Sequence, residues 1–193
     1  MGVLGIVAAI IGVSATSASL GPPGLESIDW ARADTMVVRL PPSAFPKLPP
    51  AVRAVLQRRG CTIPQSFQAT APENVVRGEF LKRGQQDWAV LCSCELVSRV
   101  LIIRGDTGAV VDSLAEEPDV GRLQVVAASQ VGYSRVIATA PAKQVRVYLS
   151  QDGAPAIARG GTLHDGIFDV FLEKGAEVFY SDNGTWVTIA ASD

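Results

Sequence analysis

The chain has 193 residues, of which 48% are apolar and 19% charged, and its net charge is −2. This length fits one domain, the charge balance excludes the basic field that nucleic-acid-binding proteins use, and the apolar content excludes a disordered chain. A single histidine excludes a His-rich zinc site and leaves few candidates for acid–base chemistry at neutral pH.

An apolar run over residues 2–13 opens the chain, and no charged side chain occurs before Glu26. The run is shorter than the roughly 20 residues that span a bilayer, but it has the length of a signal-peptide core, and Thr16-Ser17-Ala18 suits the cleavage site. We therefore expect a signal peptide over 1–18, a secreted or periplasmic protein, and no transmembrane span in the mature chain. Because no Lys or Arg precedes the run, an uncleaved N-terminal membrane anchor and a buried apolar helix are the alternatives.

A Pro-rich segment is expected over 19–50, followed by a single domain over 51–193. One short helix is predicted at about 50–59, where Val52, Val55 and Leu56 form one apolar face and Gly60 suits the left-handed stop. It is the only helix that we expect in the mature chain.

The remainder of the chain has the residue types and turn signals of β-strands. Strands are predicted over residues 35–40, 74–80, 87–93, 97–104, 109–114, 123–128, 134–139, 144–150, 176–182 and 185–190. Because no long helical pattern alternates with them, antiparallel pairing is favoured over a parallel sheet. The expected fold class is α+β, a mainly antiparallel β-sheet with one short helix packed against it.

The last two strands flank Asn183-Gly184, the strongest short hairpin signal. A two-residue turn pairs Asp182 with Thr185, Tyr180 with Val187 and Val178 with Ile189, and these residues are assigned to the core face. The opposite face carries Phe179 and Trp186 as diagonal neighbours. Either a second layer covers this aromatic pair, which is the favoured alternative, or the pair is an exposed patch that binds a ligand.

Export would permit a disulfide among Cys61, Cys92 and Cys94. Cys92 and Cys94 are not expected to bond to each other, so one of them is the candidate partner of Cys61. Cys92 directly follows the apolar residues 88–91, whereas Cys94 lies beside Glu95 at the polar end of its strand, and this favours a Cys61–Cys92 bridge. Such a bridge stabilises by about 3–4 kcal/mol and leaves Cys94 as a free or intermolecular thiol.

Residues 78–90, GEFLKRGQQDWAV, resemble the FG-GAP repeat of integrin-α-type and bacterial surface propellers, G-D-F-N-G-D-G-x-x-D-[LI]-A-V. Asp87 keeps its carboxylate, but Leu81 and Arg83 stand where the calcium loop needs side-chain oxygens, and an arginine there opposes a cation. The resemblance implies a strand–turn–strand shape without a metal. The motif occurs once, whereas a propeller needs several blades.

A second resemblance is to a family of small exported bacterial proteins of uncharacterised function. It rests on residues 46–49, 58–65, 78–93 and 164–167. This resemblance implies export and a Cys61–Cys92 bridge, and it carries no activity.

One cluster has catalytic residue types, namely His164, Asp165 and Asp169. A histidine beside carboxylates can act as a base with an orienting acid, but no nucleophile motif accompanies it. A turn that hydrogen-bonds its own backbone is the preferred interpretation. Contact with a ligand, catalysis by these residues, and a nucleophilic cysteine that uses His164 are the alternatives.

Together these patterns predict a non-catalytic binding or interaction module of the cell envelope, with an unknown protein or envelope ligand as its partner. The binding surface is expected at the face or edge around the last hairpin and the His164 loop, with Phe179, Trp186 and His164 as its residues. No cofactor, no metal and no nucleic acid are expected. The alternatives are a small secreted hydrolase that uses His164 with Asp165 or Asp169, and an inhibitor of a secreted enzyme.

Overall fold

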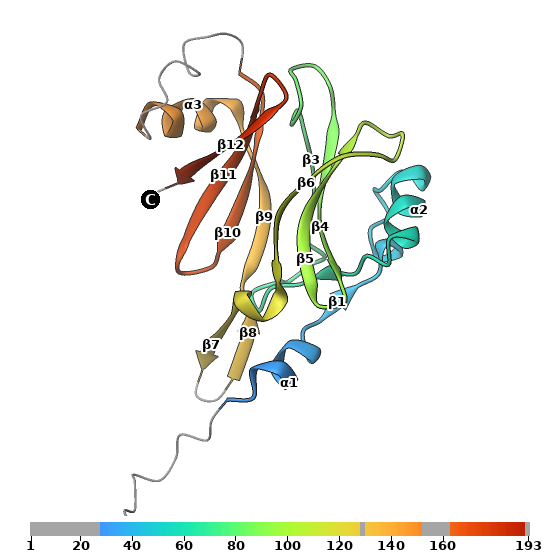
Figure 1. The fold of residues 1–193 in the computed structure, drawn as a ribbon, viewed down its shortest axis with the longest axis vertical. Coiled ribbons are helices and arrows are strands. Elements are labelled where there is room, and N and C mark those ends of the chain that lie inside the picture. Colours follow the sequence, from blue (N-terminus) through green and yellow to red (C-terminus); the bar gives the residue numbers. More distant parts are fainter. Residues whose placement is uncertain (1–27, 128–129, 152–162, 192–193) are drawn as a thin grey trace, which may run out of the picture.

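A computed structural model of the protein describes residues 28–127, 130–151 and 163–191, and antiparallel β-sheet predominates in this part of the chain (Figure 1). The first four-stranded sheet has the order β3 (Val75–Gly78), β4 (Asp87–Cys94), β5 (Val97–Arg104) and β6 (Ala109–Pro118). The second has the order β12 (Thr185–Ala191), β11 (Gly175–Asp182), β10 (Gly166–Phe171) and β9 (Arg135–Ala140). The expectation of a mainly antiparallel sheet is confirmed. The expected signal peptide lies outside the described residues.

Two short two-stranded ribbons and two 3₁₀ helices accompany the sheets in the described residues. β1 (Arg39–Leu40) pairs with β2 (Ile63–Pro64), and β7 (Leu123–Ala127) pairs with β8 (Gln130–Tyr133). The 3₁₀ helices are η1 (Pro42–Ala44) and η2 (Asp119–Arg122). The predicted strand over 35–40 is therefore mostly wrong, because only its last two residues pair.

The predicted helix is confirmed as α2 (Pro50–Arg58), in which Val52 and Leu56 are buried. Two further helices, α1 (Trp30–Thr35) and α3 (Ala142–Gln151), were not expected. The strand predicted over 144–150 is wrong, because these residues lie in α3. The Val145-Arg146-Val147 alternation mimics a strand, but Val145 and Leu149, one helical turn apart, are the residues that α3 buries.

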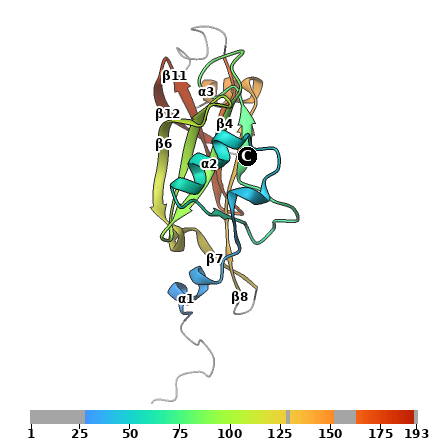
Figure 2. The same cartoon turned by 90° about the vertical axis from the view of Figure 1, so that its right-hand side faces the viewer.

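The layers follow the order helix, sheet, sheet, helix (Figures 1 and 2). α2 covers the outer face of the first sheet, and α3 covers part of the outer face of the second. The inner faces of the two sheets pack against each other through a cluster that includes Leu91, Ile102, Ile167 and Phe179. Each sheet is consequently apolar on both faces, which explains why several strands are near-continuous apolar runs.

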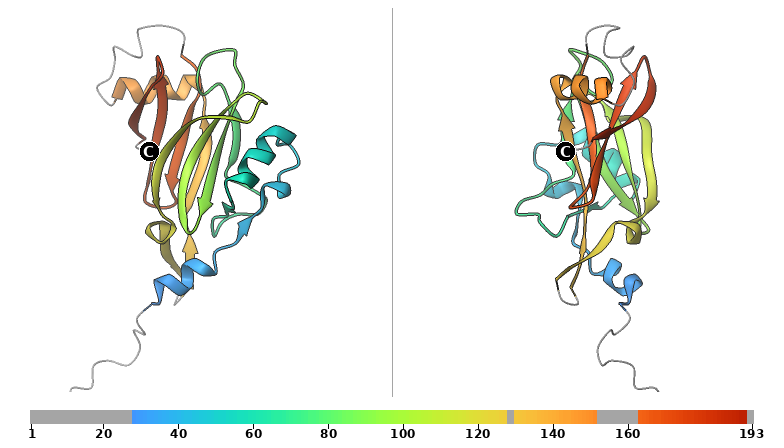
Figure 3. Two further views of the ribbon diagram at one scale, coloured as in Figure 1. Left: turned by 45° about the vertical axis from the view of Figure 1, so that its right-hand side comes forward. Right: turned by 90° about the vertical axis from the view of Figure 1, so that its left-hand side faces the viewer.

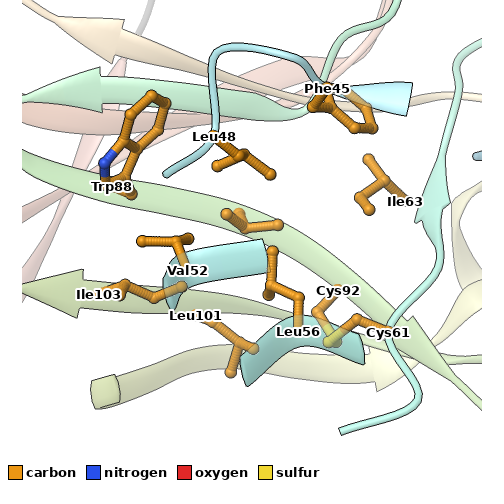
Figure 4. Packing of buried hydrophobic residues seen from close by; sticks show 11 residues of the cluster. Phe45, Leu48, Val52, Leu56, Cys61, Ile63, Trp88, Cys92, Leu101 and Ile103 are labelled. Atoms are coloured by element: carbon orange, nitrogen blue, oxygen red, sulfur yellow. A yellow bond between two sulfur atoms is a disulfide. The ribbon is translucent and has the colours of Figure 1, made fainter. Parts of the chain in front are cut away.

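The outer cluster under α2 contains the disulfide (Figure 4). Cys61 and Cys92 are bonded, with their Cα atoms 5.0 Å apart, so the predicted bridge is confirmed. Cys94, two residues further along β4, lies on the same face as Cys92 and is a free thiol beside Gly60. Phe45 and Leu48, from the Pro-rich segment, also belong to this core.

One asparagine joins the two sheets where the edge strands β3 and β9 meet. Asn74 is 1% exposed, and its side chain accepts a hydrogen bond from the backbone N–H of Ile137 at 2.8 Å. Its amide nitrogen donates to the carbonyls of Pro64 and Arg135. The β3 and β9 edges therefore face each other, and the outward edges of the two sheets are β6 and β12.

Candidate functional site

The side chain of His164, the only histidine, is held by backbone carbonyls on both sides of its ring. Nδ1 lies 2.9 Å from the carbonyl oxygen of Asp165, and Nε2 lies 2.9 Å from that of Ser181. The ring stacks on Tyr180 with 4.5 Å between centroids and is buried. Because both nitrogens are occupied by the fold, neither is available to take a proton from a substrate.

Asp165 and Asp169 are each bound to other parts of the fold. The Asp165 carboxylate accepts hydrogen bonds from the backbone N–H groups of Ala142, at the start of α3, and Glu79, in the loop after β3. The preferred interpretation of residues 164–169 as a turn is wrong from Gly166 onward, because β10 begins there. Alternation along β10 places Asp169 between the sheets, whereas His164 packs against Tyr180 on the α3 side. His164 and Asp169 therefore lie on different sides of the second sheet and do not form an acid–base pair.

Asp169 belongs to a cluster of charges buried between the two sheets. Arg135, which is 0% exposed, donates from Nε and Nη2 to the two carboxylate oxygens of Asp169 at 3.0 and 2.7 Å. Its remaining donors reach the hydroxyl of Ser98 and the carbonyl of Ala115, and Nη1 lies 3.0 Å from the Glu117 carboxylate. Burial opposes the charge on Arg135, but the hydrogen bonds and charge of Asp169 outweigh it and raise the arginine pKa. The arrangement links the two sheets, since Arg135 and Asp169 belong to the second sheet and Ser98, Ala115 and Glu117 to the first.

A neighbouring pair of buried acids holds the N-terminal segment. Arg39 pairs with Asp34 and, at 2.7 Å, with Asp119, and the Asp119 carboxylate also accepts from the Ser93 hydroxyl. Burial raises the pKa of Tyr133, whose hydroxyl lies 3.4 Å from that of Ser98. Nothing in the sequence marks these residues, because isolated charges in β-rich segments usually face solvent.

The loop that resembles an FG-GAP repeat is organised by protein donors around Asp87. This fully buried carboxylate accepts from the backbone N–H groups of Leu81 and Gly105 and from the side-chain amide of Gln85. The loop joins β3 and β4, which pair as a hairpin. Across the described residues, no three potential metal-ligating side chains gather.

The pairing predicted for the last hairpin is confirmed residue by residue. However, the aromatic pair on its second face is not an exposed patch. Phe179 is 6% exposed and Trp186 is half-buried, because the first sheet covers this face. This is the favoured alternative of the two, and of the aromatic pair only Trp186 keeps a partly exposed side chain.

The outward edge of β12 offers unpaired backbone groups instead. Asn183-Gly184 forms a two-residue turn with positive φ at both residues, and in such a turn the flanking pair, Asp182 and Thr185, is hydrogen-bonded. Along the antiparallel strands β11 and β12, hydrogen-bonded pairs then alternate with pairs that are not hydrogen-bonded to each other. The N–H and C=O groups of Trp186, Thr188 and Ala190 consequently point away from β11. In the part of the chain that the structure describes, no strand pairs with this side of β12.

The other outward edge, β6, carries the features that prevent edge-to-edge pairing. It contains Asp112, Glu116, Glu117 and a terminal Pro118, and its pairing with β5 shifts register twice. β12, with the sequence TWVTIAA, has no charge, no proline and an unbroken register. Sequence reasoning placed this strand correctly and expected a binding surface at the face or edge of its hairpin, but it did not single out the uncharged outward side of β12.

A cavity adjoins the C-terminal end of β12. It has a volume of about 560 Å³ and lies on the outer face of the second sheet, beside α3. Its walls include Tyr148, Phe168, Phe171 and Ala191, with Lys174 and Glu173 among its polar groups. Lys174 lies over the Phe171 ring, with its Nζ 4.1 Å from the ring centroid. The site is thus concave, with aromatic and polar side chains in its walls, next to the end of an open strand edge.

No protein-family model matches this chain, and neither a curated protein nor a solved structure matches it. Among the described helices, none is long and apolar enough to cross a membrane.

Proposed function

We propose that the protein is an exported, non-catalytic α+β binding module of the cell envelope, and that it binds an extended segment of a partner protein along β12. The observation that carries this proposal is the outward edge of β12, with free backbone groups at Trp186, Thr188 and Ala190 and no charge, proline or bulge to protect it. An extended peptide adds to such an edge as one more strand.

Backbone pairing would supply the affinity, and the adjoining cavity would supply selectivity. Each new strand hydrogen bond contributes about 0.5–1.5 kcal/mol net, so pairing at Trp186, Thr188 and Ala190 is enough for a weak, reversible complex. Alternate side chains of the added strand face the outer side of the sheet, where the cavity lined by Tyr148 and Phe168 adjoins Ala191. An apolar or aromatic side chain in the peptide suits this lining.

The envelope placement is supported by two observations. Residues 2–13 form an apolar run of signal-peptide length. Cys61 and Cys92 form a disulfide, and disulfides generally form and persist in oxidising compartments outside the cytosol. The non-catalytic part of the proposal is supported by His164, whose ring nitrogens both face backbone carbonyls.

The test is selection of peptides from a phage-displayed random library, followed by amide hydrogen exchange of the protein with a selected peptide. We expect new protection at the amides of Trp186, Thr188 and Ala190. The amides of Val187 and Ile189, which already bond to β11, should change little. Protection elsewhere, or none, would refute the proposal.

Thr188→Pro supplies the matched perturbation. It removes an outward N–H without cutting a bond to β11, and we expect about tenfold weaker peptide binding. Thr188→Val keeps the N–H and should bind within about twofold of the original chain. If Thr188→Pro lowers the melting temperature markedly, Ala190→Pro serves the same purpose. Protection of the same amides at high protein concentration without peptide would assign the edge to a second copy of the chain, against the proposal.

A further inference from the structure

Large exposed apolar side chains gather at one end of the molecule. All but one of the large exposed apolar residues that the structure describes belong to elements at the lower end of the molecule in Figure 1. The exception is Val147, which lies on α3, away from that end. The others are Trp30, Met36, Val38, Leu96, Val120 and Val125, and we call them the apolar end. Met36 and Val38 are the most exposed, at 73% and 61%.

These side chains belong to elements that contact one another. α1 touches both η2 and β8, and β8 pairs with β7, which carries Val125. Leu96, in the turn between β4 and β5, accepts a backbone hydrogen bond from Asp119 at the start of η2. The views in Figure 3 also bring α1, η2 and the β7–β8 ribbon to the same end. The elements that carry the apolar end therefore lie together at one end of the described chain.

The chain that precedes this surface carries the apolar run. Residues 14–27 connect the run at 2–13 to Ile28, which lies two residues before α1. Even fully extended, 14 residues reach at most about 50 Å. In the alternative in which the run is kept as an uncleaved N-terminal anchor, the bilayer that holds it is within a short tether of the apolar end.

We propose that the apolar end rests on the surface of a lipid bilayer, with Trp30, Met36 and Val38 entering the headgroup region. Tryptophan and aliphatic side chains favour this interfacial depth. Arg39 pairs with two carboxylates, those of Asp34 and Asp119, so this group is net negative and offers no attraction to an anionic surface. Attraction to the bilayer would therefore be apolar and not electrostatic. This proposal shares the envelope placement of the proposed function but does not depend on peptide binding.

The orientation leaves the proposed peptide edge accessible. β12 lies toward the opposite end of the second sheet from the β7–β8 ribbon (Figures 1 and 3). A bilayer beneath the apolar end would not cover the outward groups of Trp186 and Thr188. Membrane contact and peptide binding can therefore occur together.

The test reconstitutes the full chain into phosphatidylcholine vesicles with brominated acyl chains and measures tryptophan fluorescence. Trp88 is buried and Trp186 is half-buried, so we expect Trp30 to carry the bromine-dependent quenching. Trp30→Phe should remove it. Quenching that persists in Trp30→Phe, or that is absent in the original chain, would overturn the proposal.

A matched pair of variants tests the mechanism. Met36→Ser with Val38→Ser should weaken docking about tenfold, because two side chains lose their apolar contact. Val147→Ser, an equally polar change at a site 49% exposed on α3, should leave the quenching unchanged. Equal effects of the two variants would refute docking by the apolar end.

Two further outcomes identify a different occupant. Replacing phosphatidylcholine with phosphatidylglycerol should change the quenching by less than about twofold, and a larger, salt-sensitive increase would mean electrostatic binding. Without lipid, acrylamide should reach Trp30 equally at all protein concentrations. Shielding that grows with concentration would assign the surface to a second copy of the chain. Peptide protection of the Thr188 amide, measured without vesicles, fails or succeeds independently of these results.

Discussion

Replacing Arg135 with methionine tests whether the charges between the sheets stabilise the fold. Met has a similar length but no charge, so Arg135→Met leaves little cavity while removing every hydrogen bond of the guanidinium. Asp169, which is 3% exposed, then loses its two-point partner and keeps only Arg122, whose Nη2 is 3.7 Å away. Ser98 and the Ala115 carbonyl also lose their donor.

Breaking a buried ion pair by removing one partner costs about 3–5 kcal/mol, because the remaining charge stays desolvated. Glu117 keeps its 2.6 Å contact with Arg122, so the unpaired charge is chiefly that of Asp169. We therefore expect the free energy of unfolding to fall by about 3–4 kcal/mol. That loss is a large share of the 5–15 kcal/mol that typically separates folded from unfolded states.

The assay is urea unfolding followed by tryptophan fluorescence, with the disulfide kept oxidised. Arg99→Met is the matched control, because Arg99 pairs with Glu116 at 2.8 Å on the surface and its loss should cost less than about 1 kcal/mol. Arg135→Met combined with Asp169→Leu should recover part of the loss, since no buried charge is left unpaired. If Arg135→Met costs no more than Arg99→Met, the reasoning about the buried cluster is refuted.

Four other predictions concern groups whose partners the structure identifies. Burial raises the pKa of Tyr133 above its ordinary 10, so the folded state holds the phenol proton more tightly than the unfolded state. The contribution of this group to the free energy of unfolding is complete below pH 10 and falls by about 1.4 kcal/mol per pH unit above it. Urea unfolding midpoints measured at pH 9 and pH 11 should show this loss of stability, and Tyr133→Phe should abolish the part that comes from Tyr133. Thiol titration in denaturant without reductant should find one thiol, Cys94, and three would contradict the disulfide. Replacing both bridging cysteines by alanine should cost about 3–4 kcal/mol in the same unfolding assay. Calcium should leave the melting temperature unchanged, because the Asp87 carboxylate already accepts three protein hydrogen bonds; a clear rise would show that the loop binds metal.

Local patterns in the sequence were sufficient for the elements whose geometry depends on neighbouring residues. The Asn183-Gly184 turn determined the register of the last hairpin, because a two-residue turn with positive φ at both positions fixes which residues of the two strands face each other. The apolar spacing and the flanking Pro50 and Gly60 located α2. The polarity around Cys92 and Cys94 identified the cysteine that joins Cys61.

Other features depended on which surfaces the tertiary structure brings together. The Val145–Val147 alternation fits a strand or a helix equally in isolation, and α3 forms because Val145 and Leu149 pack on the second sheet. Phe179 is buried because the first sheet covers a face that a lone hairpin would expose.

The sequence by itself determined the four strands of the first sheet, the last hairpin and the disulfide, since each follows from contacts that local chemistry selects. Only the tertiary structure decided that His164 is held by two carbonyls, that Arg135 and Asp169 are buried between the sheets, and that β12 keeps an open edge. The physical reason is that these features depend on segments that are distant in the sequence and meet only in the folded chain. Those segments supply the partner of a buried side chain, and they leave one side of a strand paired or unpaired.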